Sequence, residues 1–280
     1  MPIMLSIITI NYNNAPGLQK TMESVFAQLS QEFEYIVVDG DSTDGSKEII
    51  KQFESDIDKL NSDLKDKFTW ISEKDSGIYN AMNKGIRMAK GEYCQFLNSG
   101  DSLVSADVTT RMLDNMPAIS ILYGNKIKVF SNGSIIRDKG TSNISMLTFY
   151  QGTINHCTAY IIRSLFDLYG MYDESLKIVS DWKFYLIAIA LHNEKVEYRD
   201  IDICFFDMTG ISSSNRELDT KERRQVLLEL LPLSVLTDYD RYAFTIAQAQ
   251  RLKRYWITRN LFWFTDRLLF KFEKWFHSEF

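Results

Sequence analysis

The stretch that decides the fold is LSIITINYNNAPGLQKTMESVFAQLSQEFEYIVVDGDSTDG, residues 5–45. Residues 5–10 form an apolar, β-branched run of the kind that fills a buried strand. Apolar residues then recur at helical spacing from Leu18 to Leu29, and residues 33–38 repeat the strand pattern. Two strands separated by a helix-length crossover are typical of a βαβ unit, so this stretch predicts a parallel sheet.

The alternation of strand and helix continues to residue 97 and then loosens. Asp44 is a good N-cap residue for the next helix, and Gly91 ends a later one. Strands are predicted over 68–71 and 93–97, with helical patterns over 49–57 and 78–89. Beyond residue 100 the predicted strands cover 119–123, 126–130, 134–137, 157–162 and 196–207, with an apolar helix over 181–191 and a further helix from Thr220 that breaks at Pro232.

Composition and charge exclude several classes of protein. The 280 residues are 45% hydrophobic and 25% charged, which excludes a disordered chain and suffices to bury a core. The net charge is −5, but residues 251–280 hold seven basic and three acidic side chains, so residues 1–250 carry −9. A nucleic-acid-binding protein would not usually carry this much net negative charge over residues 1–250.

Cysteine spacing and hydropathy add further exclusions. Cys94, Cys157 and Cys204 lie far apart with no C-x-x-C, which argues against a disulfide scaffold or a zinc ribbon and favours a reducing compartment. Residues 1–14 lack the basic start of a signal peptide, and no apolar run reaches the length of about 18 residues that a membrane span needs. The sequence therefore predicts a cytoplasmic protein.

Polar residues follow four of the predicted strands, at the carboxyl end of each. Asn11 and Tyr12 follow the first strand, and Asp39, Asp75 and residues 98–101 follow the next three. In open parallel sheets, ligands bind in the crevice at this edge. The chain has no G-x-G-x-x-G after the first strand, no G-x-x-x-x-G-K-[ST] and no G-x-S-x-G. These absences favour a nucleotide held by side chains, with a divalent metal neutralising its phosphates.

Four of these segments together resemble the successive motifs of family 2 glycosyltransferases, which are inverting enzymes of the GT-A fold. They are SIITINYN at 6–13, VDGDSTDG at 38–45, DSGIYNAMNKG at 75–85 and FLNSGD at 96–101. The similarity is dense over residues 4–105 and reappears at 155–156, 177–184 and 210–213. It is nearest to bacterial enzymes of capsule, exopolysaccharide and O-antigen assembly. The resemblance implies an α/β GT-A fold with a mostly parallel sheet, flanking helices and a C-terminal helical extension.

The resemblance assigns roles on the donor side. Tyr12 matches an aromatic residue at the nucleotide base, Asp39 an acid that binds uracil, and Asp75 an acid on the ribose and base side of the pocket. Lys84 stands near a position where many members carry an arginine that faces the diphosphate. The full donor-binding set implied is Asn11, Tyr12, Asp39, Asp41, Asp75, Lys84, Asn98, Ser99, Gly100 and Asp101.

The metal motif departs from the family pattern. The family's D-x-D-D reads Asn98-Ser99-Gly100-Asp101, which leaves Asp101 as its one carboxylate. Mn²⁺ or Mg²⁺ keeps several waters and leans on substrate phosphates, so one protein carboxylate can suffice. Many family members supply a further metal ligand from a histidine, and Asp207 is the candidate nearest to that position in this sequence. Alternatively, Asp207 only ends a strand.

The resemblance also implies a catalytic base and an acceptor side. Asp181 matches the family's catalytic aspartate, with Ser180 in place of the usual glutamate. Inverting transfer needs one base to take the acceptor's hydroxyl proton; alternatively, Asp181 is a charge that favours a helix N-terminus. Trp182 falls on the acceptor side. His156 matches a histidine that could contact acceptor or phosphate, or be a satisfied core residue.

The resulting expectation is a hexosyl- or N-acetylhexosaminyl-transferase that moves a sugar from a nucleoside-diphosphate donor, UDP above all, to a lipid-linked or glycan acceptor. The alternative is an inactive nucleotide-sugar-binding partner. The expected parts are a nucleotide-sugar-binding half over 1–105, an acceptor-binding half over 106–215 and a helical segment over 216–280. Residues 211–219 read as a loop that orders over the donor. The basic, aromatic segment 251–280 suits the anionic inner face of the plasma membrane; packing on the catalytic domain or on a second subunit, as in a homodimer, stays open.

Overall fold

A computed structural model describes residues 4–30, 32–60, 64–115, 118–210, 215–254, 260–261 and 263–270. The chain divides into two compact units, Met1–Val226 and Leu227–Phe280. The first unit holds the sheet and the candidate site, and the second is helical.

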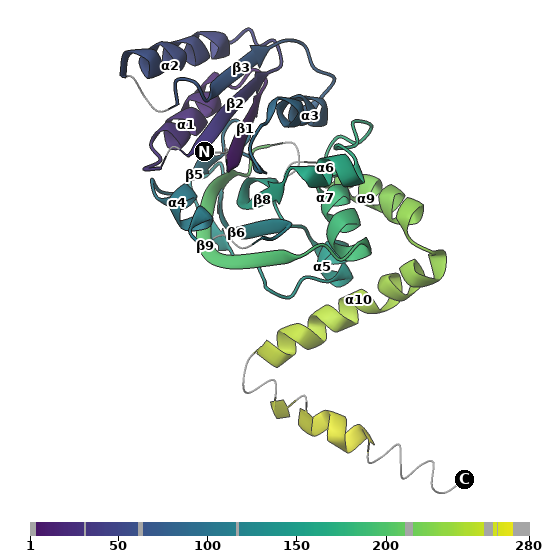
Figure 1. Cartoon of the computed structure of the whole chain (residues 1–280). Helices are drawn as coiled ribbons and strands as arrows, with labels where there is room; N and C mark the ends of the chain where they lie inside the picture. The colour runs from purple at the N-terminus through teal and green to yellow at the C-terminus, as the bar shows by residue number, and fades with distance from the viewer. Residues whose placement is uncertain are drawn as a thin grey trace, which may run out of the picture. The chain divides into compact units, whose positions relative to one another are not determined.

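The first half of the sheet is the parallel sheet that the sequence predicts. Four strands lie in the order β3-β2-β1-β4, all parallel, and three helices make the crossovers (Figure 1). The strands are β1 (Leu5–Asn11), β2 (Phe33–Asp39), β3 (Phe68–Ser72) and β4 (Tyr93–Phe96), and the helices are α1 (Ala15–Phe26), α2 (Ser46–Leu60) and α3 (Ile78–Met88).

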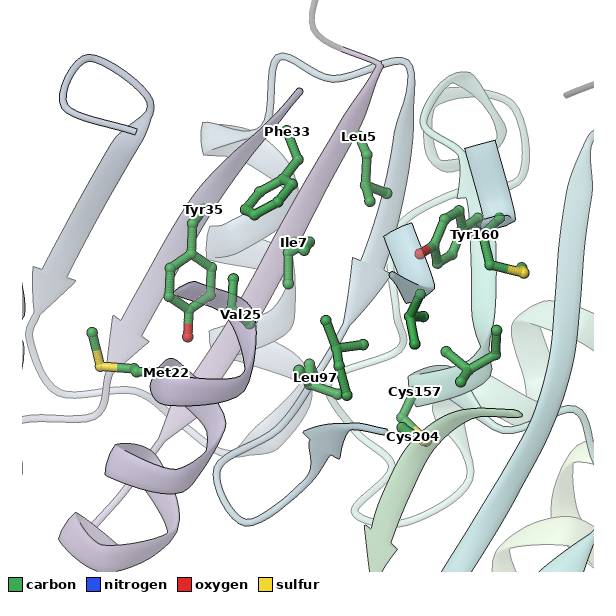
Figure 2. Close-up of a cluster of buried hydrophobic side chains, with 14 of the residues drawn as sticks. Leu5, Ile7, Met22, Val25, Phe33, Tyr35, Leu97, Cys157, Tyr160 and Cys204 are labelled. Carbon is green, nitrogen blue, oxygen red and sulfur yellow. A yellow bond between two sulfur atoms is a disulfide. The ribbon is translucent and has the colours of Figure 1, made fainter. Parts of the chain in front are cut away.

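The alternation of side chains along β1 explains how helices cover both faces of this sheet. Ile7 belongs to a buried cluster that also contains Leu18 and Met22 of α1 (Figure 2). Ile8 points the other way, toward α3, where a Cβ on Gly85 would lie 2.4 Å from its Cγ2. A glycine at residue 85 therefore lets α3 approach the sheet closely.

The second half of the sheet is mixed. It continues the order as β8-β6-β9-β5, with β7 paired to β6; β6 and β9 are parallel and the other pairs are antiparallel. The elements are β5 (Ser102–Leu103), α4 (Val108–Leu113), β6 (Ile121–Val129), β7 (Ile135–Asp138), α5 (Met146–Gln151), β8 (Ala159–Ile162), α6 (Ser164–Tyr169) and β9 (Val196–Asp207). The two strands predicted over 119–130 are one strand, with register shifts near Asn125.

Three predicted boundaries differ from the structure. The strand expected from residue 157 begins with a 3₁₀ turn, η1 (His156–Thr158), which the Asn155 side chain caps by accepting the N–H of Cys157. The helix expected over 181–191 is α7 (Ser180–Tyr185) followed by a π-helical segment, η2 (Leu186–Leu191). Of the loop expected over 211–219, residues 211–214 lie outside the described residues, and α9 (Arg216–Leu230) already begins at Arg216.

Cys157 and Cys204 form a disulfide, which the sequence analysis did not predict. They are 47 residues apart in the chain, and both lie in the buried cluster that includes Leu97 and Tyr160 (Figure 2). Cys94 is free and buried. Cysteine spacing could not predict the pair because the sheet, and not a local motif, brings residues 157 and 204 together.

The second unit contains α10 (Leu233–Arg254), which starts directly after Pro232, and further helical residues at 263–270. Leu261, Phe264 and Leu269 expose 61%, 62% and 64% of their surface. Within the described ranges, no helix combines the length and the apolar composition that crossing a bilayer requires.

Candidate active site

The ends of β1 and β2 hold a buried polar pair. Asn11 and Asp39 are register partners, and Asn11 Nδ2 donates to Asp39 Oδ1 at 2.8 Å. The other oxygen of Asp39 accepts the Ser42 N–H at 3.0 Å and the Ser72 hydroxyl at 2.6 Å. Burial raises the pKa of Asp39, but the hydrogen bonds from Ser42, Ser72 and Asn11 outweigh it and hold the pKa below its usual value. Asp39 is therefore a fixed, ionised carboxylate.

Tyr12 and Asp75 converge on Gly40. The Tyr12 ring is 67% exposed, directly after β1. A Cβ on Gly40 would lie 2.6 Å from Asp75 Oδ2 and 3.1 Å from Tyr12 Cδ2. The other Asp75 oxygen accepts the Gly77 N–H at 3.0 Å, at the start of α3. Because residue 40 has no side chain, the Asp75 carboxylate and the exposed Tyr12 ring can both approach its backbone closely.

Two further charges of the predicted donor set lie in ion pairs. Asp41 pairs with Lys47 of α2 at 2.6 Å. Lys84 pairs with Glu73 at 2.8 Å and donates to the Lys74 carbonyl at 2.9 Å. Asp41 is thereby tied to α2, and Lys84 to the segment that joins β3 to Asp75. Neither residue is linked to Asp39 by a hydrogen bond in the described part of the chain.

Asp101 and Asp207 meet between β4 and the end of β9. The Asp207 N–H donates to Asp101 Oδ1 at 2.9 Å. Gly100, at φ 106°, faces the same residue, since a Cβ there would lie 3.0 Å from Asp207 Oδ2. The loop is anchored from α1, because Asn14 Nδ2 donates to the Ser99 carbonyl at 3.1 Å and Lys20 Nζ to the Gly100 carbonyl at 3.0 Å.

The chemistry of this pair fits a divalent metal ion. Asp101 is 3% exposed, and its Oδ2 has no hydrogen-bond partner in the described residues. Burial raises the pKa of Asp101 to about 6, against the lowering effect of His156. No cluster of three or more His, Cys, Asp or Glu suited to a metal occurs in the described residues. Two carboxylates can nevertheless hold an ion that takes its other ligands from water and substrate phosphates.

Asp181 lies in the first turn of α7 and is linked to Asp101 through His156. Asp181 Oδ2 is 3.2 Å from His156 Nδ1, and Asp181 Oδ1 accepts the Tyr79 hydroxyl at 3.0 Å. His156 Nε2 is 3.1 Å from Asn98 Nδ2 and 3.9 Å from Asp101 Oδ2. Because an ionised carboxylate only accepts hydrogen bonds, the proton on His156 Nδ1 is directed at Asp181.

The environment of Asp181 favours its ionised form. Burial raises the pKa of Asp181, but the hydrogen bond and charge of His156, the Trp182 N–H and the Tyr79 hydroxyl outweigh burial and hold the pKa below its usual value. The side chain is 13% exposed. Such a group can accept a proton from a hydroxyl placed against it.

Trp182 does not line an accessible surface, contrary to its predicted place on the acceptor side. It is 1% exposed, and its indole N–H donates to the Phe149 carbonyl at 2.8 Å. Arg223 of α9 lies over its ring, 4.7 Å from the centroid, and also donates to the Gly152 carbonyl. Trp182 therefore supports the segment that carries Asp181 through packing.

Sequence reasoning missed two residues that hold this segment. Tyr79 of α3 reaches both Asp181 and the Ile178 carbonyl. Glu222 of α9 is 6% exposed and accepts the N–H groups of Lys177 and Ile178 at 2.8 and 2.9 Å. The tyrosine stands within the quoted motif at 75–85, but Glu222 lies more than forty residues beyond Ile178 and has no local signal.

Known proteins similar to this chain share the glycosyltransferase name. The chain is 33% identical over 219 residues to an uncharacterised glycosyltransferase of Mycobacterium tuberculosis, covering 75% of this chain and 77% of the relative. It is 28% identical over 235 residues to a PGL/p-HBAD biosynthesis glycosyltransferase of Mycobacterium bovis, covering 82% and 85%.

Solved structures of low sequence identity support the fold. TarS residues 1–349 of S. aureus, in complex with UDP-GlcNAc, aligns at a TM-score of 0.59 and 20% identity over 81% of this chain and 66% of that one. The mannosyltransferase PcManGT of Pyrobaculum calidifontis, in complex with GDP-Man and Mn²⁺, aligns at 0.59 and 15% identity over 93% and 83%. The GT-A type of α/β fold expected from the sequence is thereby confirmed. The model of the family described as Glycosyl transferase family 2 matches residues 6–170, and the chain belongs to that family.

Proposed function

We propose that this glycosyltransferase is an inverting enzyme that moves a sugar from a UDP-sugar to a lipid-linked or glycan acceptor in bacterial surface polysaccharide synthesis. One observation carries the proposal: an ionised carboxylate, Asp181, contacts His156 Nδ1, and the other ring nitrogen of His156 lies 3.9 Å from the buried Asp101 Oδ2. The imidazole of His156 thus lies between the proposed base, Asp181, and Asp101, which would anchor the leaving diphosphate. The TarS complex with UDP-GlcNAc supports the donor class, and the PGL/p-HBAD biosynthesis relative supports a biosynthetic role.

In the proposed reaction, the nucleoside lies at the ends of β1, β2 and β3. We assign the Tyr12 ring to stacking on the base, and Asp39 and Asp75 to accepting hydrogen bonds from base and ribose. Asp181 takes the proton of the acceptor hydroxyl while that oxygen attacks the anomeric carbon. His156 donates to Asp181 and fixes the orientation of its carboxylate.

Asp101 and Asp207 would hold Mn²⁺ or Mg²⁺. When bound, such an ion stabilises the negative charge that develops on the departing diphosphate. The Mn²⁺ in the PcManGT complex supports this part of the proposal. Among the buried side-chain atoms of the described residues that lack a hydrogen-bond partner, Asp101 Oδ2 is the one carboxylate oxygen, and a cation would compensate its burial.

A thermal-shift screen of UDP-, GDP- and dTDP-sugars, each with and without Mn²⁺, tests the proposal. A specific ligand at a hundredfold excess over Kd stabilises the fold by about 2.7 kcal/mol. We expect a metal-dependent shift with one nucleotide. No shift with any of the three would contradict the proposal. A shift without turnover over a range of acceptors would favour the alternative, an inactive nucleotide-sugar-binding partner, for which the reduced carboxylate count at Asn98 and Gly100 is the supporting feature.

Gly40→Ala should weaken donor binding by about tenfold without unfolding the protein. The added Cβ would displace the Asp75 carboxylate from 2.6 Å and press on the Tyr12 ring. A tenfold loss corresponds to about 1.4 kcal/mol, the size of one hydrogen bond to a charged group. Calorimetric titration with UDP measures it, and Gly152→Ala is the control, since a Cβ there meets nothing nearer than 3.6 Å. Unchanged UDP affinity would place the nucleoside elsewhere.

Glu222→Gln should lower kcat by about tenfold and leave donor affinity unchanged. A carboxylate accepts the Lys177 and Ile178 N–H groups with both oxygens, whereas an amide offers one, so the backbone that leads to Asp181 loses a support. Exposed Glu217→Gln on the same helix is the control. Loss of donor affinity, or a fall in kcat matched by the control, would refute a positioning role.

The proposed location is the cytoplasmic face of the plasma membrane. The exposed Leu261, Phe264 and Leu269, and the +4 charge of residues 251–280, suit an interface with anionic lipid. Deleting residues 251–280 should abolish co-sedimentation with anionic liposomes while the cooperative melt persists. A truncated protein that aggregates would instead assign the segment to the core or to a homodimer contact. The division into halves at residue 105 and a helical segment from residue 216 likewise remains a proposal.

A further inference from the structure

Lys126 is a mostly buried cation whose ammonium has no hydrogen-bonded acidic partner in the described residues. It lies on β6, and its side chain is 14% exposed. Its Nζ is 3.8 Å from Asp138 Oδ2, beyond hydrogen-bond distance, and the same oxygen lies 2.8 Å from Lys128 Nζ. Two ammonium groups thus share one carboxylate, and Lys128 has the better geometry. No hydrogen bond from the Lys126 ammonium is found in the described residues.

The ammonium of Lys126 lies beside the candidate active site. It stands over the Phe206 ring, 5.1 Å from the centroid. The Phe206 ring is in turn 6.1 Å from the His156 ring, which contacts Asp181. Burial lowers the pKa of Lys126, while the charges of Asp138, Asp181 and Asp101 act in the opposite direction. The Phe206 ring therefore lies between the Lys126 ammonium and the His156 ring.

The carboxylates nearby do not satisfy this cation. Asp181 accepts from His156 and Tyr79, and Asp101 Oδ1 accepts from the Asp207 N–H, while Asp101 Oδ2, which has no hydrogen-bond partner in the described residues, is the oxygen proposed to hold the metal. A buried ammonium costs several kcal/mol unless an anion or acceptors compensate it. Three N–H donors at the edge of a reaction centre, with one aromatic face beneath them, form a site for an anionic oxygen that arrives with the substrate.

We propose that Lys126 binds a phosphate oxygen of a substrate beside Asp181. The proposal rests on the proposed glycosyl transfer and adds to it a residue that no motif assigns. Two substrates could bring the phosphate: the diphosphate of the donor, or a phosphate that links the acceptor to its lipid. Both offer the same chemistry, a dispersed negative charge with several acceptor oxygens.

The test compares Lys126→Met, Lys126→Arg and the control Lys128→Met in the full-length chain by calorimetric titration with Mn²⁺ present. The first probes are UDP, GDP and dTDP; the second is octyl phosphate added to protein saturated with the nucleotide that binds. Lys126→Met should weaken one probe by about 10- to 100-fold, the value of a charge-assisted hydrogen bond. The affinity of Lys126→Arg for both probes should stay within a few-fold of wild type. The affinity of Lys128→Met should equal that of wild type.

The outcomes distinguish the donor from the acceptor as the source of the phosphate. They also distinguish failure of the Lys126 assignment from failure of the proposed function. Weaker nucleotide binding in Lys126→Met assigns the site to the donor diphosphate, and weaker octyl phosphate binding assigns it to the acceptor. Unchanged affinity for both probes, with a cooperative melt at or above that of wild type, overturns the assignment of Lys126. An equal loss in Lys128→Met also overturns it, because general charge then explains the effect. A wild-type protein that binds none of the three nucleotides overturns the proposed function itself.

Discussion

Asp181→Asn should lower the transfer rate by about 10²–10⁴-fold and leave nucleotide affinity within a few-fold of wild type. The amide has the same shape, and its oxygen can still accept from His156 or Tyr79, but it cannot take the acceptor's proton. Because the pKa of Asp181 lies below its usual value, the wild-type base is already ionised at neutral pH. Raising the pH should therefore not rescue the variant.

The measurements are kcat with a nucleotide-sugar donor and the Kd for the matching nucleoside diphosphate. Asp167→Asn provides a control, since Asp167 is an exposed carboxylate on the neighbouring helix α6. A variant at residue 181 that loses nucleotide affinity or melting temperature to the same extent as activity would show that Asp181 stabilises the fold and is not the base.

Asp101→Asn should reduce kcat/KM by about 10²-fold or more and remove the metal-dependent part of nucleotide binding. A bound ion stabilises the leaving diphosphate by several kcal/mol, and Asp101 supplies its buried carboxylate. The amide oxygen can still accept the Asp207 N–H, so the loop between β4 and β5 keeps its anchor. Nucleotide titrations with Mn²⁺ and with EDTA measure the effect. Activity that survives both EDTA and this substitution would contradict the metal site.

Stability gives an independent readout for Asp101. Its pKa is raised to about 6 in the folded state from an ordinary value of 3.8, so the folded form holds its proton more tightly. Metal-free stability therefore falls as pH rises from about 4 to about 6, and the full cost remains above pH 6. The neutral amide removes this cost, so the metal-free variant should melt at or above the wild-type temperature at pH 7.

The arrangement of the residues proposed to bind the donor was predictable because parallel strands bring their carboxyl ends together. Asn11 and Asp39 end adjacent strands in matching register, and this places one amide against one carboxylate. The loops that follow these strands meet at the same edge of the sheet, and this brings together Tyr12, Gly40 and Asp75. Here local patterns of period 2 and period 3.6 determine both the sheet and the edge where polar residues collect.

The acceptor side was less predictable because its contacts depend on how the mixed half of the sheet packs. His156 comes from a 3₁₀ turn after a long irregular segment, yet it meets residues 98, 101 and 181. Glu222 reaches Ile178 from a helix whose start the sequence analysis placed four residues too late. The Cys157–Cys204 disulfide and the burial of Trp182 likewise depend on how the mixed half of the sheet packs. Periodicity predicts which face of an element is buried but not which distant residues meet there.

The most direct test of the central claim is the anomeric configuration of the first product. The donor that gives the largest metal-dependent thermal shift is incubated with the protein without an acceptor, so that water attacks the anomeric carbon, and proton NMR follows the released sugar before it can mutarotate, in wild type and in Asp181→Asn. An α-linked donor should yield a β-configured product together with free nucleoside diphosphate, and Asp181→Asn should abolish both signals. A product of retained configuration, or equal nucleotide release by the two proteins, would contradict a single-base inverting transfer at Asp181.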